Sequence, residues 1–354
     1  MSDETSVDVA AELDQFRKRY QQLNRQITAQ QGQLDWSSPN SVVLEHGAMR
    51  LRHFEGGDLT QIPLLIVYSH VNQPCVIDLH PDHSLVKRII EKGHRVYILD
   101  WGEVREPDRE NDISVYVEEY IDAAVSYLQQ HGGFEAVNLL GICQGGTFAL
   151  CYACLHPTKV NKLVTLVTPV DFHAGDSLLT HWARFLDMNI LASNPQNIPG
   201  TLITMLFQMM RPFEDMIRQV QQIDQPAVGR KLELMMKMDQ WVYHCPDQPG
   251  RAFAQFVQGF FQENALVQDS LEIGGNQVRL DSLQMPVLNV FAKYDHLVPP
   301  ESSAALKRFV DSSAYQELEF EGGHIGLLVS KKAQLTILPE IGTWLAEPVE
   351  YRPS

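Results

Sequence analysis

The sequence has little of what marks a secreted, membrane-spanning or zinc-binding protein. Residues 1–30 are polar and mixed in charge, so we predict no secretory signal. The most apolar runs, at residues 64–68 and 201–210, fall short of the roughly 20 residues that cross a bilayer. The five cysteines are irregularly spaced and form no paired CxxC motif. These absences predict a cytoplasmic protein with reduced thiols, no transmembrane segment and no metal site.

Basic residues are also scarce. There are 28 Lys and Arg against 44 Asp and Glu, which leaves a formal charge of −16. Affinity for nucleic acid comes mostly from basic side chains on phosphates, so this balance argues against a nucleic-acid partner. It leaves room for a local basic pocket for a phosphorylated ligand. The 354 residues are 44% hydrophobic and 20% charged. This composition suits a globular protein with a sizeable core.

The N-terminal segment, residues 1–35, has a helical pattern. Five apolar residues recur at spacings of three and four: Leu13, Phe16, Tyr20, Leu23 and Ile27. This spacing gives a narrow apolar seam between polar residues, as in an amphipathic helix. Such a helix packs against its own chain or docks on another subunit, and the pattern alone leaves both readings open.

From residue 36 onward, extended runs alternate with helical segments. After a hairpin around Gly47, we predict strands at 63–69, 95–100, 134–142, 162–168, 285–292 and 315–321. We predict helices at 85–92, 112–132, 144–156, 303–310 and 332–345. This alternation indicates an α/β fold with a mostly parallel sheet and helices on both of its faces.

The alternation stops after Val170. Residues 173–275 are rich in helix formers and aromatic residues, show no clear strand and contain most of the 11 methionines. We therefore predict one α/β domain, residues 36–172 and 276–354, interrupted by a helical cap or lid at 173–275. The insertion leaves after the strand that follows the nucleophile strand and returns before the strand at 285–292 that leads to Asp295, so we expect it to cover the functional edge of the sheet.

Residues 137–146, VNLLGICQGG, carry the most informative motif. An apolar strand runs into G-x-C-x-G-G and then into a helix, which is the arrangement of a nucleophile elbow. Gly141 and Gly145 permit the sharp turn, which projects Cys143 at the start of the helix. The helix dipole there stabilises the reactive thiolate. We therefore predict that Cys143 is a nucleophile rather than an inert buried thiol, with the N–H of Gln144 aimed at an oxyanion.

Such a nucleophile needs a base and a group that orients the base. In α/β-hydrolase-like chains the order is nucleophile, acid, histidine. Asp295 follows a predicted strand in FAKYDHLVPP, and His324 precedes the last predicted helix in EFEGGHIGLL. Cys143, Asp295 and His324 therefore predict acyl transfer by a thiol on an α/β-hydrolase fold. Whether the acceptor is water or an alcohol stays open.

Other polar residues near strand ends are weaker candidates. The loop after the strand at 63–69 commonly supplies a second oxyanion N–H, and we expect Val71 to be that donor. Asn72 and His296 are candidate substrate-binding residues, with a structural role as the alternative for His296. Three further residues are expected only to shape loops: Asp100, Asp171 and His173.

Several longer motifs resemble one known family. They are GICQGG, DWG, YDHLVPP, GGHIGLLVS and WVYHCPDQPGRAFAQFVQGFFQENAL, spread over residues 40–347. Together they resemble the catalytic subunit of the short, class III polyhydroxyalkanoate synthases, in the α/β-hydrolase superfamily. The resemblance implies that Cys143 carries the growing acyl chain as a thioester and that His324 takes its proton. Asp295 would assist His324 or act on the 3-hydroxyl of the incoming monomer.

The resemblance also implies the substrate and the setting. The substrate would be (R)-3-hydroxyacyl-CoA, with release of CoA and no separate cofactor. The catalytic subunit would work with a non-catalytic partner subunit, as a homodimer or higher oligomer, in the cytoplasm at the granule surface. This chain departs from the family at Gln73, where Arg is common, and at Cys75, where an aromatic residue is common.

Two other readings remain beside this one. A cysteine hydrolase of the dienelactone hydrolase or thioesterase type would share the same three site residues, although dienelactone hydrolases usually lack such a large helical insertion. A non-catalytic scaffold on the same fold is the other, and an intact set of Cys143, Asp295 and His324 argues against it.

Overall fold

The computed structural model describes residues 34–188, 196–210, 229–311 and 313–349, with a few single residues at positions 14–21 and 213–220. The seam residues of the predicted N-terminal helix, from Leu13 to Ile27, lie outside the described residues. Whether that helix packs on its own chain or docks on another subunit stays a prediction.

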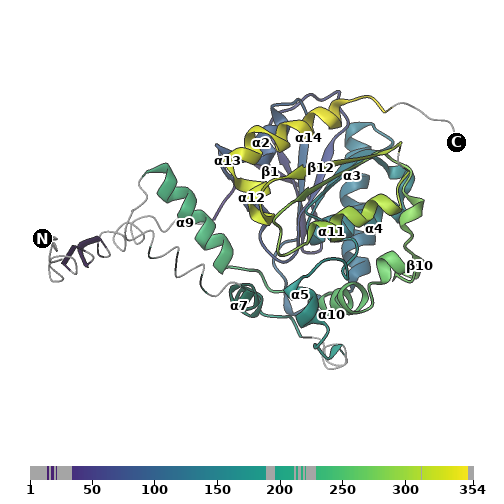
Figure 1. Cartoon of the computed structure of the whole chain (residues 1–354). Coiled ribbons are helices and arrows are strands. Elements are labelled where there is room, and N and C mark those ends of the chain that lie inside the picture. The colour runs from purple at the N-terminus through teal and green to yellow at the C-terminus, as the bar shows by residue number, and fades with distance from the viewer. Residues whose placement is uncertain are drawn as a thin grey trace, which may run out of the picture.

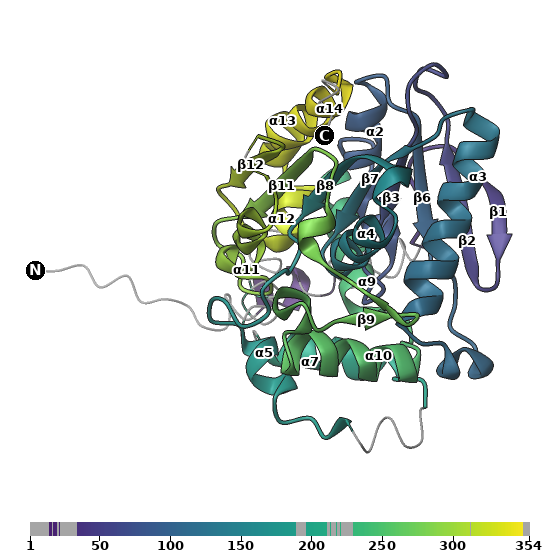
Figure 2. The ribbon, with the colours of Figure 1, turned by 90° about the vertical axis from the view of Figure 1, so that its right-hand side faces the viewer.

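The described residues form an eight-stranded sheet in the order β1-β2-β6-β3-β7-β8-β11-β12, which Figure 2 shows from β12 on the left to β1 on the right. The strands are β1 (Asn40–His46), β2 (Met49–Phe54), β3 (Leu64–Val67), β6 (Val96–Asp100), β7 (Val137–Ile142), β8 (Val160–Leu166), β11 (Val287–Ala292) and β12 (Tyr315–Phe320). β2 pairs antiparallel with both β1 and β6. All other pairs within this eight-stranded sheet are parallel, which confirms the mostly parallel sheet.

Helices cover both faces of the sheet. Alternate residues of each strand point to opposite sides, so each strand contributes to both helical layers. On β3, Leu65 and Val67 face the layer of α3 (Asp122–Gly132) and α4 (Gln144–Leu155). Leu64 and Ile66 face the other layer. That layer consists of α2 (Leu85–Ile90), α12 (His324–Val329), α13 (Lys331–Leu335) and α14 (Ile337–Ala346). Both faces are buried, so the central strands read as continuous apolar runs.

Three predicted helices differ from the observed ones. The helix expected at 303–310 is a short α-helix, α11 (Pro300–Ala304), followed by a 3-10 helix at Ala305–Arg308. The helix expected at 332–345 is broken at Thr336 into α13 and α14, because Pro339 lacks an N–H and its ring clashes with a helical carbonyl at Leu335. The helix expected at 112–132 begins as a π-helix, Val115–Ile121, before α3. Within the described ranges, no helix combines the length and the apolarity needed to cross a membrane.

The insertion contains α5 (Leu178–Ala183), α7 (Gly200–Met210), α9 (Arg230–Tyr243), α10 (Gly250–Phe256) and a π-helix, Val257–Gln262. Figures 1 and 2 both show α5, α7 and α10 below the sheet, and in Figure 1 α9 extends to the left of the sheet. The Ser177 hydroxyl donates to the carbonyl of Leu297, so the insertion contacts the loop after β11.

The prediction of no clear strand in residues 173–275 was wrong in one place, the two-residue strand β9 (Glu272–Ile273) at the end of the insertion. Ile198 and Gln248 form an isolated antiparallel bridge. β9 pairs with β10 (Asn276–Gln277) across Gly274 and Gly275, whose φ angles are +59° and +79°. Two successive left-handed residues make the tight turn that two-residue hairpins favour, and glycine adopts it without strain. The Gly-Gly pair was the overlooked signal.

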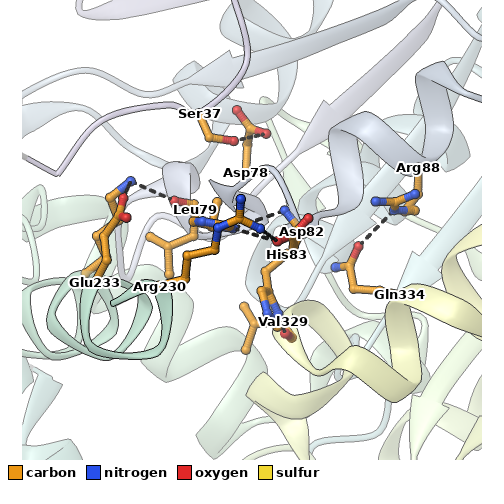
Figure 3. Close-up of polar contacts among 12 residues, drawn as sticks. Ser37, Asp78, Leu79, Asp82, His83, Arg88, Arg230, Glu233, Val329 and Gln334 are labelled. Atoms are coloured by element: carbon orange, nitrogen blue, oxygen red, sulfur yellow. Dashed lines mark hydrogen bonds and ion pairs between the residues drawn. The ribbon is translucent and has the colours of Figure 1, made fainter. Parts of the chain in front are cut away.

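A small hairpin of β4 (Asp78–His80) and β5 (His83–Ser84) links α9 to the C-terminal helices (Figure 3). The ring of His83 donates through Nδ1–H to the carbonyl of Val329, the last residue of α12. Arg230 of α9 lies 3.4 Å from the carboxylate of Asp82. Both of these charged side chains are exposed, so their ion pair contributes little to stability.

A buried lysine holds the end of α14. Lys162 of β8 is 3% exposed, and its ammonium donates to the carbonyls of Trp344 at 2.7 Å and Glu347 at 2.6 Å. The ammonium also lies 4.7 Å from the centre of the Trp344 ring. Burial lowers the pKa of Lys162, partly offset by the charge of Glu347. The lysine thereby satisfies carbonyl groups that a helix end leaves without intrahelical partners.

Candidate active site

Cys143 occupies a strained turn between β7 and α4. Its φ and ψ are 53° and −127°, a combination rare for any residue other than glycine. A side chain at Gly145 would collide with the backbone carbonyl of Tyr68, and one at Gly141 would collide with the backbone of Gly146. Only glycine fits these two positions, and the turn has the geometry of a nucleophile elbow.

Asp295 and His324 form a buried pair. Asp295 Oδ2 lies 2.7 Å from His324 Nδ1, and because a carboxylate accepts, Nδ1 carries the proton. The other oxygen, Oδ1, accepts from the N–H groups of Leu297 and Val298, each at 2.9 Å. The two side chains are 1% and 6% exposed. The carboxylate is thereby held rigidly, and it fixes both the tautomer and the orientation of the imidazole.

The structure brings Cys143 to the same histidine. The Cys143 side chain lies close enough to the His324 ring to raise its pKa, and since Nδ1 is bonded to Asp295, Nε2 is the nitrogen left for the sulfur. Burial alone would lower the pKa of His324, but the neighbouring Asp295 carboxylate and Cys143 outweigh it and raise the pKa well above its ordinary value. The ring therefore favours its protonated form, which places a cation beside the sulfur.

The loop after β3 lies against the elbow. The N–H of His70 donates to Gln144 Oε1 at 3.1 Å. The N–H of Val71, our expected oxyanion donor, donates to the hydroxyl of Ser69 at 3.1 Å. To stabilise an oxyanion, Val71 would have to exchange that hydroxyl for the substrate oxygen. Its assignment as oxyanion donor, like that of Gln144, stays a prediction.

The two candidate substrate-binding residues are Asn72, in the loop after β3, and His296, in the loop after β11. Asn72 Nδ2 donates to the carbonyl of Trp241, and Asn72 Oδ1 accepts from the N–H of Gln73. The Trp241 indole N–H donates in turn to the carbonyl of Gln73. Asn72 thus fastens α9 to the loop, and its polar groups are engaged within the chain. His296 is partly exposed beside Asp295.

The residues expected to shape loops have charged or polar partners. Asp100 forms an ion pair with Arg52 at 2.8 Å, at the end of β6. Asp171 forms one with Arg308 at 2.7 Å and accepts from the N–H of His173. They therefore hold strand-end loops in place. Within the described ranges, no three His, Cys, Asp or Glu side chains gather as a metal site would require.

One residue near the site escaped the sequence analysis. Gln248, in the insertion, is 2% exposed and hydrogen-bonds to His70, 178 positions earlier. It lies in the segment WVYHCPDQPG, which carried part of the family resemblance. Nothing in residue spacing indicates a contact over such a distance, so only the folded structure reveals it.

Comparisons with known proteins identify the family. The alpha/beta hydrolase fold family matches residues 40–331. The poly(3-hydroxyalkanoate) polymerase subunit PhaC of Allochromatium vinosum is 41% identical over 342 residues, 95% of this chain and 96% of that relative. The subunit of the same name from Synechocystis sp. is 38% identical over 296 residues, 81% of this chain and 78% of that relative. This chain belongs to the PhaC family of poly(3-hydroxyalkanoate) polymerase subunits.

Membership in the PhaC family confirms the resemblance drawn from the motifs and makes the chain part of an acyltransferase-type polymerase. Among solved structures, a thermophilic esterase from Thermogutta terrifontis has a TM-score of 0.52 at 17% identity, over 87% of this chain and 98% of the esterase. That likeness shows the shared fold. The PhaC relatives match at much higher identity, which favours the polymerase over the hydrolase alternative.

Proposed function

We propose that this protein is the catalytic subunit of a polyhydroxyalkanoate synthase and that Cys143 carries the growing polyester as a thioester. The observation that carries the proposal is the buried Asp295–His324 pair beside the Cys143 thiol, at the elbow between β7 and α4. The names of the PhaC relatives supply the product class, a poly(3-hydroxyalkanoate).

In the first step, the sulfur of Cys143 attacks the carbonyl carbon of a (R)-3-hydroxyacyl-CoA. The carbonyl oxygen becomes an oxyanion, for which the N–H groups of Gln144 and of the loop after β3 are the nearest candidate donors. When the oxyanion collapses, the bond to the CoA sulfur breaks. The departing thiolate takes the proton from His324 Nε2, so CoA leaves as a thiol and Cys143 is acylated.

In the second step, the 3-hydroxyl of the next monomer attacks the thioester on Cys143. Neutral His324 accepts the hydroxyl proton at Nε2, an ester bond forms, and the Cys143 sulfur leaves as a thiolate beside the protonated ring. The lengthened chain is then attached to the new CoA and returns to Cys143 by the first step. Asp295 supports this cycle through His324, because both of its oxygens are already occupied within the protein.

The insertion supports the proposals about partners and location. Leu202, Met205 and Met209 are exposed on one side of α7, and Phe185 after α5 is 88% exposed. Large exposed apolar areas mark surfaces that meet another protein or an apolar phase. We therefore assign this side of the insertion to contacts with the partner subunit, a second copy or the polyester granule, and the insertion as a whole to the role of a lid.

The test follows CoA release and turbidity with 3-hydroxybutyryl-CoA as substrate. The parent protein, supplied with its partner subunit, should release CoA as turbidity grows, whereas Cys143→Ala should do neither. Cys143→Ser should be very weak, because a hydroxyl does not give the anion that a thiol gives near neutral pH. Cys245→Ala is the matched control, since that partly exposed thiol lies in the insertion and should be dispensable.

Three outcomes would contradict the proposal. CoA release with a soluble hydroxyacid and no turbidity would make the protein a hydrolase. Retained turnover in Cys143→Ala would remove Cys143 from the mechanism. Binding without any CoA release from the parent protein would favour the scaffold reading.

A further inference from the structure

Gln248 is anchored where the insertion meets the body of the protein. Its backbone exchanges two hydrogen bonds with Ile198, at 2.8 and 2.9 Å, so its main chain is fixed within the insertion. Its side chain is 2% exposed and extends away from this bridge to the loop after β3. A buried primary amide in such a place needs a full set of partners, because an unsatisfied one costs about 1–3 kcal/mol.

The amide of Gln248 grips one residue at two points. Nε2 donates to the carbonyl of His70 at 2.7 Å, and Oε1 lies 2.9 Å from His70 Nδ1. Because the amide oxygen can only accept, Nδ1 carries the proton. The ring is buried against Trp101 and Tyr116, with centroids 5.8 and 5.1 Å away. Burial lowers the pKa of His70 to about 4, with the Gln248 contact opposing, so the ring is neutral at pH 7.

The opposite side of His70 is attached to the elbow. Its backbone N–H donates to Oε1 of Gln144, the residue that follows Cys143, at 3.1 Å. The next residue, Val71, is the expected oxyanion donor. A continuous series of contacts therefore leads from the insertion through Gln248 and His70 to the first turn of α4.

We propose that Gln248 is a positioning residue that sets the oxyanion-binding loop of the polymerase through its two-point grip on His70. The inference rests on the proposed function, in which an oxyanion forms on the substrate carbonyl at Cys143. It adds a residue of the insertion to the determinants of the reaction rate, acting through His70 and the loop after β3. This pair of hydrogen bonds needs one donor and one acceptor next to each other, and the glutamine side chain supplies both and is long enough to reach His70.

The test uses Gln248→Met, which keeps the side-chain volume and removes both polar groups. In this variant the proposed lid stays in place, but the loop after β3 loses its contact with residue 248. We expect kcat for CoA release to fall about 10- to 100-fold, because a small misplacement of an oxyanion donor raises the activation barrier. KM should change much less. Alkylation of Cys143 by iodoacetamide should keep the parent rate, because that substitution forms no oxyanion.

The matched control is Gln258→Met, the same change at an exposed glutamine of the same insertion, which should retain parent kcat. Gln144→Ala severs the other end of the connection. If both substitutions act on the same loop, kcat of the variant that combines Gln248→Met with Gln144→Ala should fall about as far as in the more impaired single variant. It should not fall by the product of the two single losses.

Three outcomes overturn the proposal. They are a parent-like kcat in Gln248→Met, an equal slowing of alkylation and turnover, and fully multiplicative losses in the double variant. Failure of the proposed function is recognised separately, because Cys143→Ala would then still release CoA.

Discussion

Asp295 supports His324 from a carboxylate whose second oxygen is bound by the backbone of its own loop. Oδ2 faces the imidazole at 2.7 Å, while Oδ1 accepts from the N–H groups of Leu297 and Val298. The position of the acid is therefore set before any substrate arrives. Because the carboxylate is fixed, the atom that it presents to Nδ1 decides which tautomer His324 adopts.

The first prediction concerns that atom. Asp295→Asn can keep the backbone contacts through its amide oxygen, but its NH2 group would then face Nδ1 and impose the wrong tautomer on His324. We expect kcat to fall about 10³- to 10⁴-fold with little change in melting temperature. Cys143 alkylation should slow as well. Unchanged alkylation with slow chain growth would instead place Asp295 on the substrate hydroxyl.

A second prediction concerns the thiol. His324→Gln removes the cation that faces the Cys143 sulfur, so alkylation by iodoacetamide at pH 7 should slow by about 10-fold or more. His173→Gln, at an exposed ring on the insertion, should keep the parent rate. Equal rates for the parent and His324→Gln would show that the histidine does not set the reactivity of the thiol.

A third prediction concerns pH and stability. The pKa of His324 is raised above its unfolded value of 6.5, chiefly by Asp295 and Cys143 against the effect of burial. Between the unfolded pKa of 6.5 and the folded pKa of about 10, the folded protein binds up to one more proton than the unfolded chain. The contribution of His324 to the free energy of unfolding is therefore complete below pH 6.5 and declines as pH rises. The slope is at most about 1.4 kcal/mol per pH unit. In urea unfolding from pH 6 to 9, His324→Gln should lack this decline, and parallel curves would contradict the assignment.

A fourth prediction concerns the contact between β3 and α4. Gly145→Ala places a methyl group against the carbonyl of Tyr68, so the free energy of unfolding should drop by about 2–4 kcal/mol, and activity should be lost as the elbow shifts. Gly259→Ala is the control, because its nearest neighbour would be Leu271 at 3.7 Å. A parent-like Gly145→Ala would mean that the elbow tolerates a wider separation from β3.

Local sequence signals predicted most of the scaffold. The strands lie within about three residues of their predicted bounds, because buried parallel strands are unbroken apolar runs that glycine and polar residues delimit. The failures were also local. Pro339 interrupts the last predicted helix, and the Gly274–Gly275 pair makes a hairpin turn where no clear strand was predicted. Both are readable from sequence once turn and helix-breaking chemistry are considered.

The site was predictable only in part. Chain order and strand ends led to the prediction of Cys143, Asp295 and His324, and the structure places these three residues next to one another. Their catalytic roles stay predictions. The partners of the loop after β3 were not predictable, because Gln248 and Trp241 approach it from an insertion whose path no periodicity defines. Long-range contacts of this kind depend on tertiary packing, which a single sequence does not encode locally.

The lysine under α14 has a practical consequence for immobilised enzyme. Since Lys162 gathers the carbonyls of Trp344 and Glu347, the last turn of α14 is clamped to β8. Figures 1 and 2 show α14 on the side of the sheet away from α5, α7 and α10. A tether fused beyond residue 347 would thus leave the insertion pointing away from a bead or chip. Trimming back to residue 343 would strand a buried ammonium without acceptors, and such a truncated chain should be recovered mainly as aggregate.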